Sequence, residues 1–453
     1  MGLALPAVRL NIAELARAVE GSVFIDGTAY DGPTGEILGA TQDSRALLAG
    51  QLFVPLIAER NGHDFIAGAV DGGAGAYFTS ETPGPGTAIA VDDTMAALSA
   101  AGRYARSLIA GPVVGITGSV GKTSAKDLLA GALAASRPTH ASTKSFNNEI
   151  GVPLTLLNTP DDAEAVVLEM GARGIGHIAT LCDVASPTVG IVTTVAGAHV
   201  GEFGSIENIA LAKGELVEGL PEAGLAVLNA DNPYVAPMAA RTNAAVLRFA
   251  VATEQAPPAD ASVVVREIEL DDELRATFTI DTEWGTVTAR PQTRGAHMAG
   301  NVAGAVGTAL WLGSSIADVE TGIADAGVSP WRMEVFRSEA GALIINDSYN
   351  ANPTSMRGAI DSLARLTAPR KIAVVGYMAE LGAGEAEAHE AIASALRDRG
   401  IEMIAVGTPL YGSTPRESPL DVQAELAALD DGCAVLIKGS RSAGLEKLAD
   451  VLR

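Results

Sequence analysis

The stretch Gly115-Ile116-Thr117-Gly118-Ser119-Val120-Gly121-Lys122-Thr123 decides how the rest of the chain is interpreted. It follows an apolar segment typical of a buried strand (Val113, Val114) and precedes a segment typical of a helix, Ser124 to Ala135. A glycine-rich turn between a strand and a helix aims backbone N–H groups at phosphates. The sequence therefore predicts a nucleotide-binding loop. A glycine-rich turn without phosphate is a poor alternative, because Gly-Lys-Thr opens a helix directly after the strand.

Each residue type in this loop has a physical task. The ammonium of Lys122 is expected to reach the outer phosphates, and the hydroxyl of Thr123 to hold a Mg²⁺ ion. The usual Walker pattern places its first glycine five positions before the Gly-Lys pair, where this chain has Ile116, so the loop is a variant. The predicted ATP-binding residues of the loop are Gly118, Ser119, Val120, Gly121, Lys122, Thr123 and Ser124.

Composition limits the class of protein. A length of 453 residues corresponds to about three domains. The 54 acidic and 31 basic residues leave a net charge of −23, which disfavours nucleic acid and anionic membranes as partners. The two cysteines argue against a disulfide framework or a zinc site. Because no apolar run resembles a signal peptide or a membrane span, we expect a cytoplasmic protein that does not insert into a membrane.

The chain divides into three α/β regions. Residues 1–110 predict a small α/β unit, and residues 111–329 alternate strands with helices, as in a mostly parallel sheet. Alternating apolar residues from Ala261 to Arg290 predict an antiparallel addition at one edge of that sheet. Residues 330–453 contain four further strand candidates and predict a doubly wound, Rossmann-like domain.

Several polar residues stand where chemistry is expected. Glu169 ends a buried strand, His199 follows the next strand, and Lys213 lies in a predicted helix from Ile206 to Gly219. Ligands bind at the carboxyl ends of strands in open α/β sheets, which favours Glu169. Taken singly, His199 and Lys213 are read as an ordinary histidine and a solvated lysine. Ser44-Arg45 precedes a strand and suits recognition of phosphate or carboxylate.

A second motif lies in the third region. Asp347-Ser348-Tyr349-Asn350-Ala351-Asn352-Pro353 follows an apolar strand and precedes a predicted helix from Ser355 to Leu366. As structure alone it is a turn rich in Asp and Asn, with Thr354 or Ser355 available to cap the helix.

Together these features resemble the Mur ligase superfamily, ATP-driven enzymes that join an acid to an amine. The loop variant, the order of Glu169, His199 and Lys213, and the Asp347–Pro353 run carry the resemblance, which covers nearly the whole chain. That run is similar to the D-(A/S)-Y-N-A-N-P run of the branch that adds D-alanyl-D-alanine. One departure is Tyr377, where relatives usually have an acidic residue. The resemblance implies the three-domain fold of the family.

The resemblance also implies an active site. Thr123 and Glu169 would hold one Mg²⁺, His199 would help to hold a second, and Lys213 would carry a CO₂-derived carbamate as a metal ligand. The implied catalytic residues are Lys122, Glu169, His199 and Lys213. The further ATP-binding residues are Asn301, Arg332 and Asp347. The substrate-binding residues are Ser44, Arg45, Asn147, Asn148, Tyr349, Asn350, Asn352 and Lys438.

The implied activity is the ATP-dependent joining of D-alanyl-D-alanine to UDP-N-acetylmuramoyl-tripeptide through an acyl phosphate, in peptidoglycan synthesis. Residues 1–110 would bind the UDP substrate, residues 111–329 ATP, and residues 330–453 the amine, as a monomer with a hinge at 329–332. A related ligase with a different acid or amine is one alternative. A catalytically silent nucleotide-binding scaffold is another, although Lys122, Glu169 and Lys213 are all present.

Overall fold

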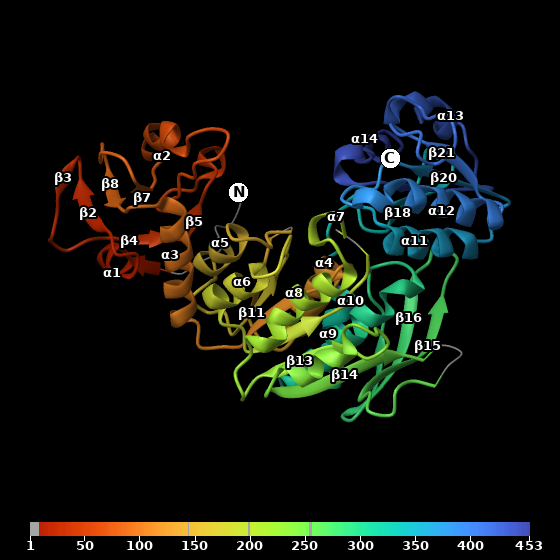
Figure 1. The fold of residues 1–453 in the computed structure, drawn as a ribbon, viewed down its shortest axis with the longest axis horizontal. Coiled ribbons are helices and arrows are strands. Elements are labelled where there is room, and N and C mark those ends of the chain that lie inside the picture. The colour runs from red at the N-terminus through yellow and green to blue at the C-terminus, as the bar shows by residue number, and fades with distance from the viewer. Residues whose placement is uncertain (1–8, 144, 198–199, 253–255) are drawn as a thin grey trace.

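The computed structural model of the protein describes residues 9–143, 145–197, 200–252 and 256–453. The chain forms three lobes that follow one another in sequence (Figure 1). The first lobe is red to orange, the central lobe runs from the orange α4 through yellow and green to the teal α9 and α10, and the third lobe is mostly blue. Within the described ranges, every helix is too short or too polar to span a lipid bilayer.

The first lobe contains a six-stranded sheet and a two-stranded one. The larger sheet has the order β3 (Thr28–Ala29), β2 (Ser22–Ile25), β8 (Thr87–Ala90), β7 (Ala76–Thr79), β6 (Leu52–Phe53), β5 (Ala40–Thr41), and the smaller one pairs β1 (Arg9–Asn11) with β4 (Glu36–Leu38). Its helices are α1 (Ile12–Ala18), α2 (Ile66–Asp71) and α3 (Thr94–Leu108). Asn11 caps α1 through its side-chain oxygen, which accepts from the backbone N–H groups of Ala13 and Glu14.

The central lobe is built on a nine-stranded sheet. Its order is β10 (Thr139–Ala141), β11 (Ala165–Glu169), β9 (Val113–Thr117), β12 (Val189–Val192), β13 (Leu225–Asn229), β14 (Ala245–Val251), β15 (Val263–Leu270), β16 (Ala276–Thr282), β17 (Gly285–Ala289). All pairs are parallel up to β15, and β15 to β17 pair antiparallel. The predicted parallel sheet with an antiparallel edge is confirmed. Strands β10 and β14 were not predicted, because polar residues interrupt their apolar pattern.

Helices cover both faces of this sheet. They are α4 (Lys122–Ala134), α5 (Gly151–Leu157), α6 (His177–Ala185), α7 (Val200–Phe203), α8 (Ile206–Glu218), α9 (Ala299–Trp311) and α10 (Ile316–Asp325). Along β9, Val114 belongs to the buried cluster that contains α4 and α9, whereas Val113 belongs to the cluster that contains α5 and α6. Successive strand residues point to opposite faces, so a continuously apolar strand serves both layers.

The third lobe has a five-stranded sheet of order β18 (Glu334–Arg337), β19 (Leu343–Asn346), β22 (Cys433–Lys438), β20 (Arg370–Val375), β21 (Glu402–Ala405). Its helices are α11 (Pro353–Arg365), α12 (Glu385–Asp398), α13 (Gln423–Ala427) and α14 (Glu446–Val451). The four predicted strands form the parallel part, and the unpredicted β18 adds an antiparallel edge. The predicted cap of α11 was wrong: Asn352 is the N-cap, and Ser355 completes a capping box with it.

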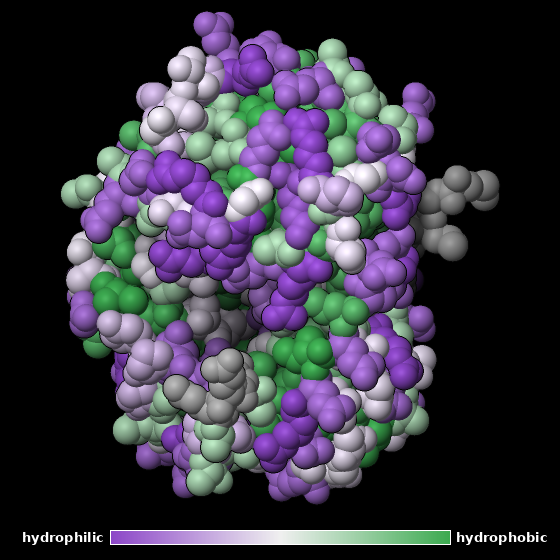
Figure 2. Space-filling view, turned by 90° about the vertical axis from the view of Figure 1, so that its right-hand side faces the viewer, coloured by the Kyte–Doolittle hydropathy of each residue, from purple (hydrophilic) through white to green (hydrophobic). Residues whose placement is uncertain are grey.

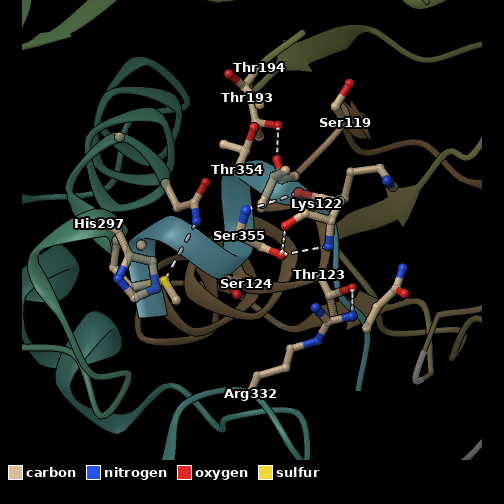
Figure 3. A pocket seen from close by; sticks show the side chains of 18 of the residues that line it. Ser119, Lys122, Thr123, Ser124, Thr193, Thr194, His297, Arg332, Thr354 and Ser355 are labelled. Atoms are coloured by element: carbon tan, nitrogen blue, oxygen red, sulfur yellow. Dashed lines mark hydrogen bonds between the residues drawn. The ribbon is translucent and has the colours of Figure 1, made fainter. Parts of the chain in front are cut away.

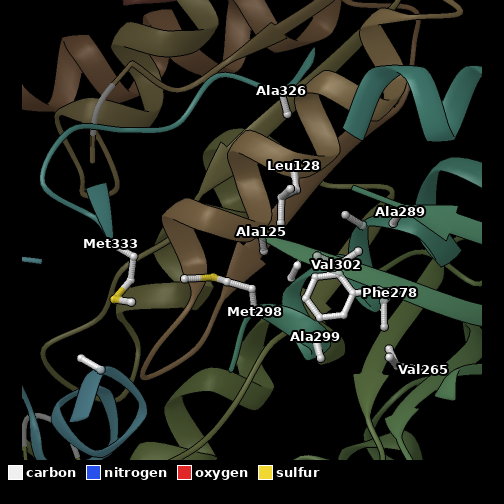
Figure 4. Close-up of a cluster of buried hydrophobic side chains, with 14 of the residues drawn as sticks. Ala125, Leu128, Val265, Phe278, Ala289, Met298, Ala299, Val302, Ala326 and Met333 are labelled. Carbon is white, nitrogen blue, oxygen red and sulfur yellow. The ribbon is translucent and has the colours of Figure 1, made fainter. Parts of the chain in front are cut away.

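A buried apolar cluster is shared across each of the two lobe boundaries. Between the first and central lobes, α3 packs on α5 and α6, and the two lobes share one buried apolar cluster. Asn158 adds two hydrogen bonds to the backbone of Ala40. In the central lobe, α4 and α9 pack through Ala125, Leu128 and Val302, with Met298 and Met333 toward the third lobe (Figure 4).

The outer face of the central and third lobes is largely hydrophilic, with apolar residues in patches between polar ones (Figure 2). This agrees with the net charge of −23. A surface of this kind favours solubility more than association through apolar contact.

Candidate functional site

The glycine-rich loop lies between β9 and α4, as the sequence predicts. Gly118 and Gly121 have positive φ angles of 155° and 88°. A Cβ atom on Gly118 would lie 1.9 Å from the Thr193 hydroxyl oxygen, and one on Gly121 would lie 2.3 Å from the side-chain oxygen of Asn301. Both positions therefore need glycine for backbone conformation and for the close approach of Thr193 and Asn301 to the loop.

Lys122 is the first residue of α4. Its Nζ atom donates a hydrogen bond to the carbonyl oxygen of Gly118 at 2.8 Å, so the side chain folds back over the loop. Burial lowers the pKa of Lys122, while the nearby carboxylate of Glu169 opposes that shift. The side chain is thus held at the mouth of the loop, where the outer phosphates of a nucleotide are expected.

Thr123 and Glu169 form a buried pair at the carboxyl edge of the central sheet. The Thr123 hydroxyl donates to Glu169 Oε2 at 2.7 Å, and the Asn147 side-chain amide donates to Glu169 Oε1 at 2.7 Å. The Arg332 guanidinium donates from Nη2 to Thr123 Oγ1 at 2.8 Å. The hydroxyl and the carboxylate are hard oxygen ligands of the kind that Mg²⁺ prefers.

The other two metal ligands that the family resemblance implies are Lys213 and His199. Lys213 lies in α8 with a relative exposure of 3%, and burial, followed by the ammonium of Lys122, holds its pKa well below the ordinary value. His199 lies outside the described residues. Within the described ranges, no three His, Cys, Asp or Glu side chains gather into a metal site. The Thr123–Glu169 pair thus fits one Mg²⁺ ion, and a second would depend on a modified Lys213.

The Asp347–Pro353 run brings the third lobe to this site. The Asp347 carboxylate accepts from the Met333 N–H at 3.1 Å and from the ammonium of Lys438, which is 2% exposed. Lys438 also donates to the Asn350 carbonyl oxygen at 3.0 Å. The buried side chain of Lys438 therefore holds the backbone and side chains of the Asp347–Pro353 run in place by hydrogen bonds.

Tyr349 connects the run to the central lobe. Its hydroxyl donates to Ser145 Oγ at 2.7 Å, and its ring lies under the guanidinium of Arg332, 4.1 Å from carbon to centroid. The stacking leaves the guanidinium edges free to donate hydrogen bonds.

These groups line one cavity of about 480 Å³ between the central and third lobes, within the size range of ligand sites. Figure 3 shows Lys122 and Thr123 facing Thr354, Ser355 and Arg332 across it. The predicted site residues that line it are Ser119, Val120, Gly121, Lys122, Thr123, Ser124, Asn147, Glu169, Asn301, Arg332, Asp347, Tyr349, Asn350, Asn352 and Lys438.

Other predicted residues lie away from the cavity wall. The side-chain oxygen of Asn148 accepts from the N–H groups of Ile150 and Gly151, just before and at the start of α5. Ser44 and Arg45 lie in a helical turn of the first lobe, where Arg45 makes two 2.8 Å bonds to the Asp43 carboxylate. Those hydrogen bonds lower the pKa of Asp43 to about 2.

The sequence analysis missed several cavity residues. Thr193 donates to the Val120 carbonyl oxygen at 2.6 Å, and Ser145 accepts from Tyr349. Thr193 and Thr194 directly follow β12, so the end of a parallel strand is the signal that could have found them. His297 was not missed: it stands one helical turn before Asn301, and the sequence suggests both for adenine or hinge contacts, with Asn301 preferred. His297 lines the cavity, and burial lowers its pKa.

Two parts of the chain match models of Mur ligase domains. Residues 116–309 match the Mur ligase middle domain, and residues 331–452 match the Mur ligase, glutamate ligase domain. The UDP-N-acetylmuramoyl-tripeptide–D-alanyl-D-alanine ligase of Mycobacterium leprae is 34% identical over 98% of each chain. The enzyme of that name from Escherichia coli is 32% identical over 92% of this chain and 96% of its own.

Solved structures show the same relationship. MurF from Acinetobacter baumannii has a TM-score of 0.87 and 29% identity, covering 99% of this chain and 100% of that one. MurF ligase from Thermotoga maritima, solved in complex with ADP, has a TM-score of 0.75 and 26% identity over 91% of this chain and 96% of that one.

Proposed function

The chain belongs to the Mur ligase family, and from this premise we propose that it joins D-alanyl-D-alanine to UDP-N-acetylmuramoyl-tripeptide. ATP is converted to ADP and phosphate in the reaction, and the product is a pentapeptide precursor of peptidoglycan. The observation that carries the proposal is the single cavity that holds both the phosphate loop and the Asp347–Pro353 run. Relatives carrying that enzyme name match along nearly the whole chain.

The chemistry has two steps. A carboxylate oxygen of the tripeptide attacks the terminal phosphorus of ATP, and ADP leaves. The amine of D-alanyl-D-alanine then attacks the carbonyl carbon of the acyl phosphate, loses a proton, and phosphate departs. Lys122 and the N–H groups at the start of α4 stabilise the negative charge on the transferred phosphoryl group. Burial of these donors strengthens them, because little water screens the interaction.

We assign two Mg²⁺ ions to the reaction, which would neutralise phosphate charge when bound. Thr123 and Glu169 would hold one, and His199 and a carbamate on Lys213 would hold the other. The lowered pKa of Lys213 supports the modification, since only a neutral amine captures CO₂. The buried environment of Lys213 would then hold an anion that the metal compensates.

Other roles follow from position. We assign ATP binding to Asn301, Arg332 and Asp347 beside the phosphate loop, and the acyl substrate to Asn147 and Tyr349. We assign the UDP part to Ser44 and Arg45 in residues 1–110, ATP to residues 111–329, and the amine to residues 330–453. Asn148, Asn350, Asn352 and Lys438 would contact substrate or hold the loops that do. We place the enzyme in the cytoplasm and treat it as a monomer.

ADP release from purified protein tests the proposal. With UDP-N-acetylmuramoyl-tripeptide as acid, D-alanyl-D-alanine is expected to give turnover well above D-Glu or meso-diaminopimelate. If a single amino acid is the better co-substrate, the assignment to the dipeptide step is wrong while the ligase class stands. If no amine promotes ADP release with this acid, the assignment is wrong, and the protein is either a related ligase for a different acid or a nucleotide-binding scaffold.

A further inference from the structure

The linker between the central and third lobes consists of residues 326–333, between α10 and β18. It follows one face of α4. A Cβ atom on Gly131 would lie 2.6 Å from that of Ala326 at the start of the linker. One turn earlier on α4, Asp127 Oδ2 accepts from the Ser329 N–H at 3.1 Å. One more turn earlier, Thr123 Oγ1 accepts from Arg332. Because these helix positions are four residues apart, all three contacts lie on the same stripe of α4.

The last of these contacts joins the third lobe to a predicted metal ligand. Figure 4 shows the linker leaving α4 at Ala326 and reaching Met333 near the other end of the helix. The backbone on both sides of Arg332 is held by the third lobe: Tyr349 N–H donates to the Trp331 carbonyl oxygen, and Met333 N–H donates to Asp347. Arg332 is thus anchored in one lobe while its guanidinium reaches into the other.

The geometry points to Arg332 as a cation that occupies the Thr123 hydroxyl oxygen in place of Mg²⁺, and whose displacement by Mg²⁺ frees the end of the linker around Arg332 from α4. This inference rests on the proposed function, which makes Thr123 and Glu169 metal ligands. In the structure the Thr123 hydroxyl donates to Glu169 and accepts from Arg332. A metal ion would use the same oxygen atoms, and two cations so close together would repel each other.

Two features fit an arginine that changes position. The Arg332 Nε atom is buried and has no hydrogen-bond partner among the described residues. A buried donor without a partner is costly, and an incoming anion such as a nucleotide phosphate could satisfy it. Trp331 and Met333, on either side of Arg332, have positive φ angles of 61° and 51°. Such backbone is strained for residues other than glycine and persists only while surrounding contacts hold it.

Mg²⁺ binding to the nucleotide-free protein, followed by calorimetry, tests this role. Replacing Arg332 by Met removes the competing charge, so Mg²⁺ is expected to bind about tenfold more tightly than to the wild type, a modest coupling between two sites. Arg332→Lys keeps a positive charge, and its affinity should stay near that of the wild type. Arg441→Met is the matched control, because Arg441 stacks on Trp331 at 4.2 Å from carbon to centroid and its guanidinium is not bonded to Thr123.

Tryptophan emission gives a second readout. Trp331 lies in the linker, so Mg²⁺ should shift emission in the wild type, and Trp331→Phe should abolish that shift while leaving Trp284 and Trp311 in place. Equal or weaker Mg²⁺ binding by Arg332→Met, an equal gain in Arg441→Met, or no Mg²⁺ binding by any variant would overturn the inference. ADP release with D-alanyl-D-alanine is measured separately, so those results leave the proposed function standing.

Discussion

We propose that the phosphate loop and the Asp43–Arg45 turn each bind an anion through a cationic side chain, but the two side chains differ in burial and in pairing. Lys122 is half-buried between two lobes, and desolvation there lowers its pKa. The Arg45 side chain is 88% exposed and is paired with a carboxylate two residues away. A cation in a low-dielectric site can stabilise charge that develops during a reaction, whereas an exposed, self-paired cation acts on binding. We therefore expect Lys122 to control kcat and Arg45 to control KM.

The strongest test of this difference is Lys122→Ala. The change removes the half-buried charge that is proposed to face the transferred phosphoryl group, and we expect ADP formation to fall by about 10³-fold or more. The fold should survive, since among the described residues the ammonium hydrogen-bonds only to its own loop. Circular dichroism checks the fold, and Lys122→Arg shows how far charge alone restores turnover. Normal turnover by a folded Lys122→Ala variant would remove the loop from the ATP site.

Lys213→Ala tests a second lysine of the central lobe, which is buried in α8. We expect a loss of about 10²-fold, because an anionic metal ligand disappears. Added formate should restore part of the turnover by occupying the vacated position. Lys122→Ala is the matched control, since formate cannot replace a positive charge and should not rescue it. Full activity of Lys213→Ala without formate would rule out the carbamate role.

Arg45→Ala tests the exposed side of the comparison. We expect the KM for UDP-N-acetylmuramoyl-tripeptide to rise about tenfold while kcat stays within about twofold, because only ground-state binding is lost. Asp43→Asn sharpens the test: Asn still caps the turn, but Arg45 loses its competing carboxylate, so this KM should fall or stay unchanged. A fall in kcat for Arg45→Ala would show that exposure does not separate the two kinds of site.

The smallest expected effect concerns Tyr377 in the third lobe. Its half-exposed hydroxyl donates to the Glu385 carboxylate, which raises the pKa of Tyr377. Tyr377→Asp would place two carboxylates together, and the KM for D-alanyl-D-alanine should rise by about threefold with the KM for ATP unchanged. Adding Glu385→Gln should reverse part of this change. An altered KM for ATP alone would place Tyr377 in the nucleotide site instead.

Much of the fold could be predicted because its strands are continuously apolar. Buried parallel strands such as β9 need apolar residues on both faces, and this pattern is visible without neighbours. Strands β10 and β18 were missed because they lie at sheet edges, where polar residues are tolerated. The cap of α11 was misplaced because Asn352, Thr354 and Ser355 are all able to cap, and only backbone geometry selects among them.

The site divides in the same way. The phosphate loop and the position of Glu169 could be predicted from the sequence. A glycine turn that opens a helix and a carboxylate that ends a strand each depend on a few neighbouring residues. The ion pairs of Arg45 with Asp43 and of Lys438 with Asp347 could not be predicted from the sequence, because they depend on side-chain rotamers and burial. Likewise, nothing local places Tyr349 against Ser145, 204 positions away in the chain.

By itself the sequence determined the three α/β regions, the nucleotide loop with its Lys122 and Thr123, and the resemblance to a ligase family. These depend on residue type and on spacing along a few turns of chain. Only the tertiary structure decided that Arg332 meets Thr123, that the linker follows α4, and that one cavity lies between the central and third lobes. Such contacts join residues distant in sequence, and their energy depends on burial and direction, which are properties of the packed chain.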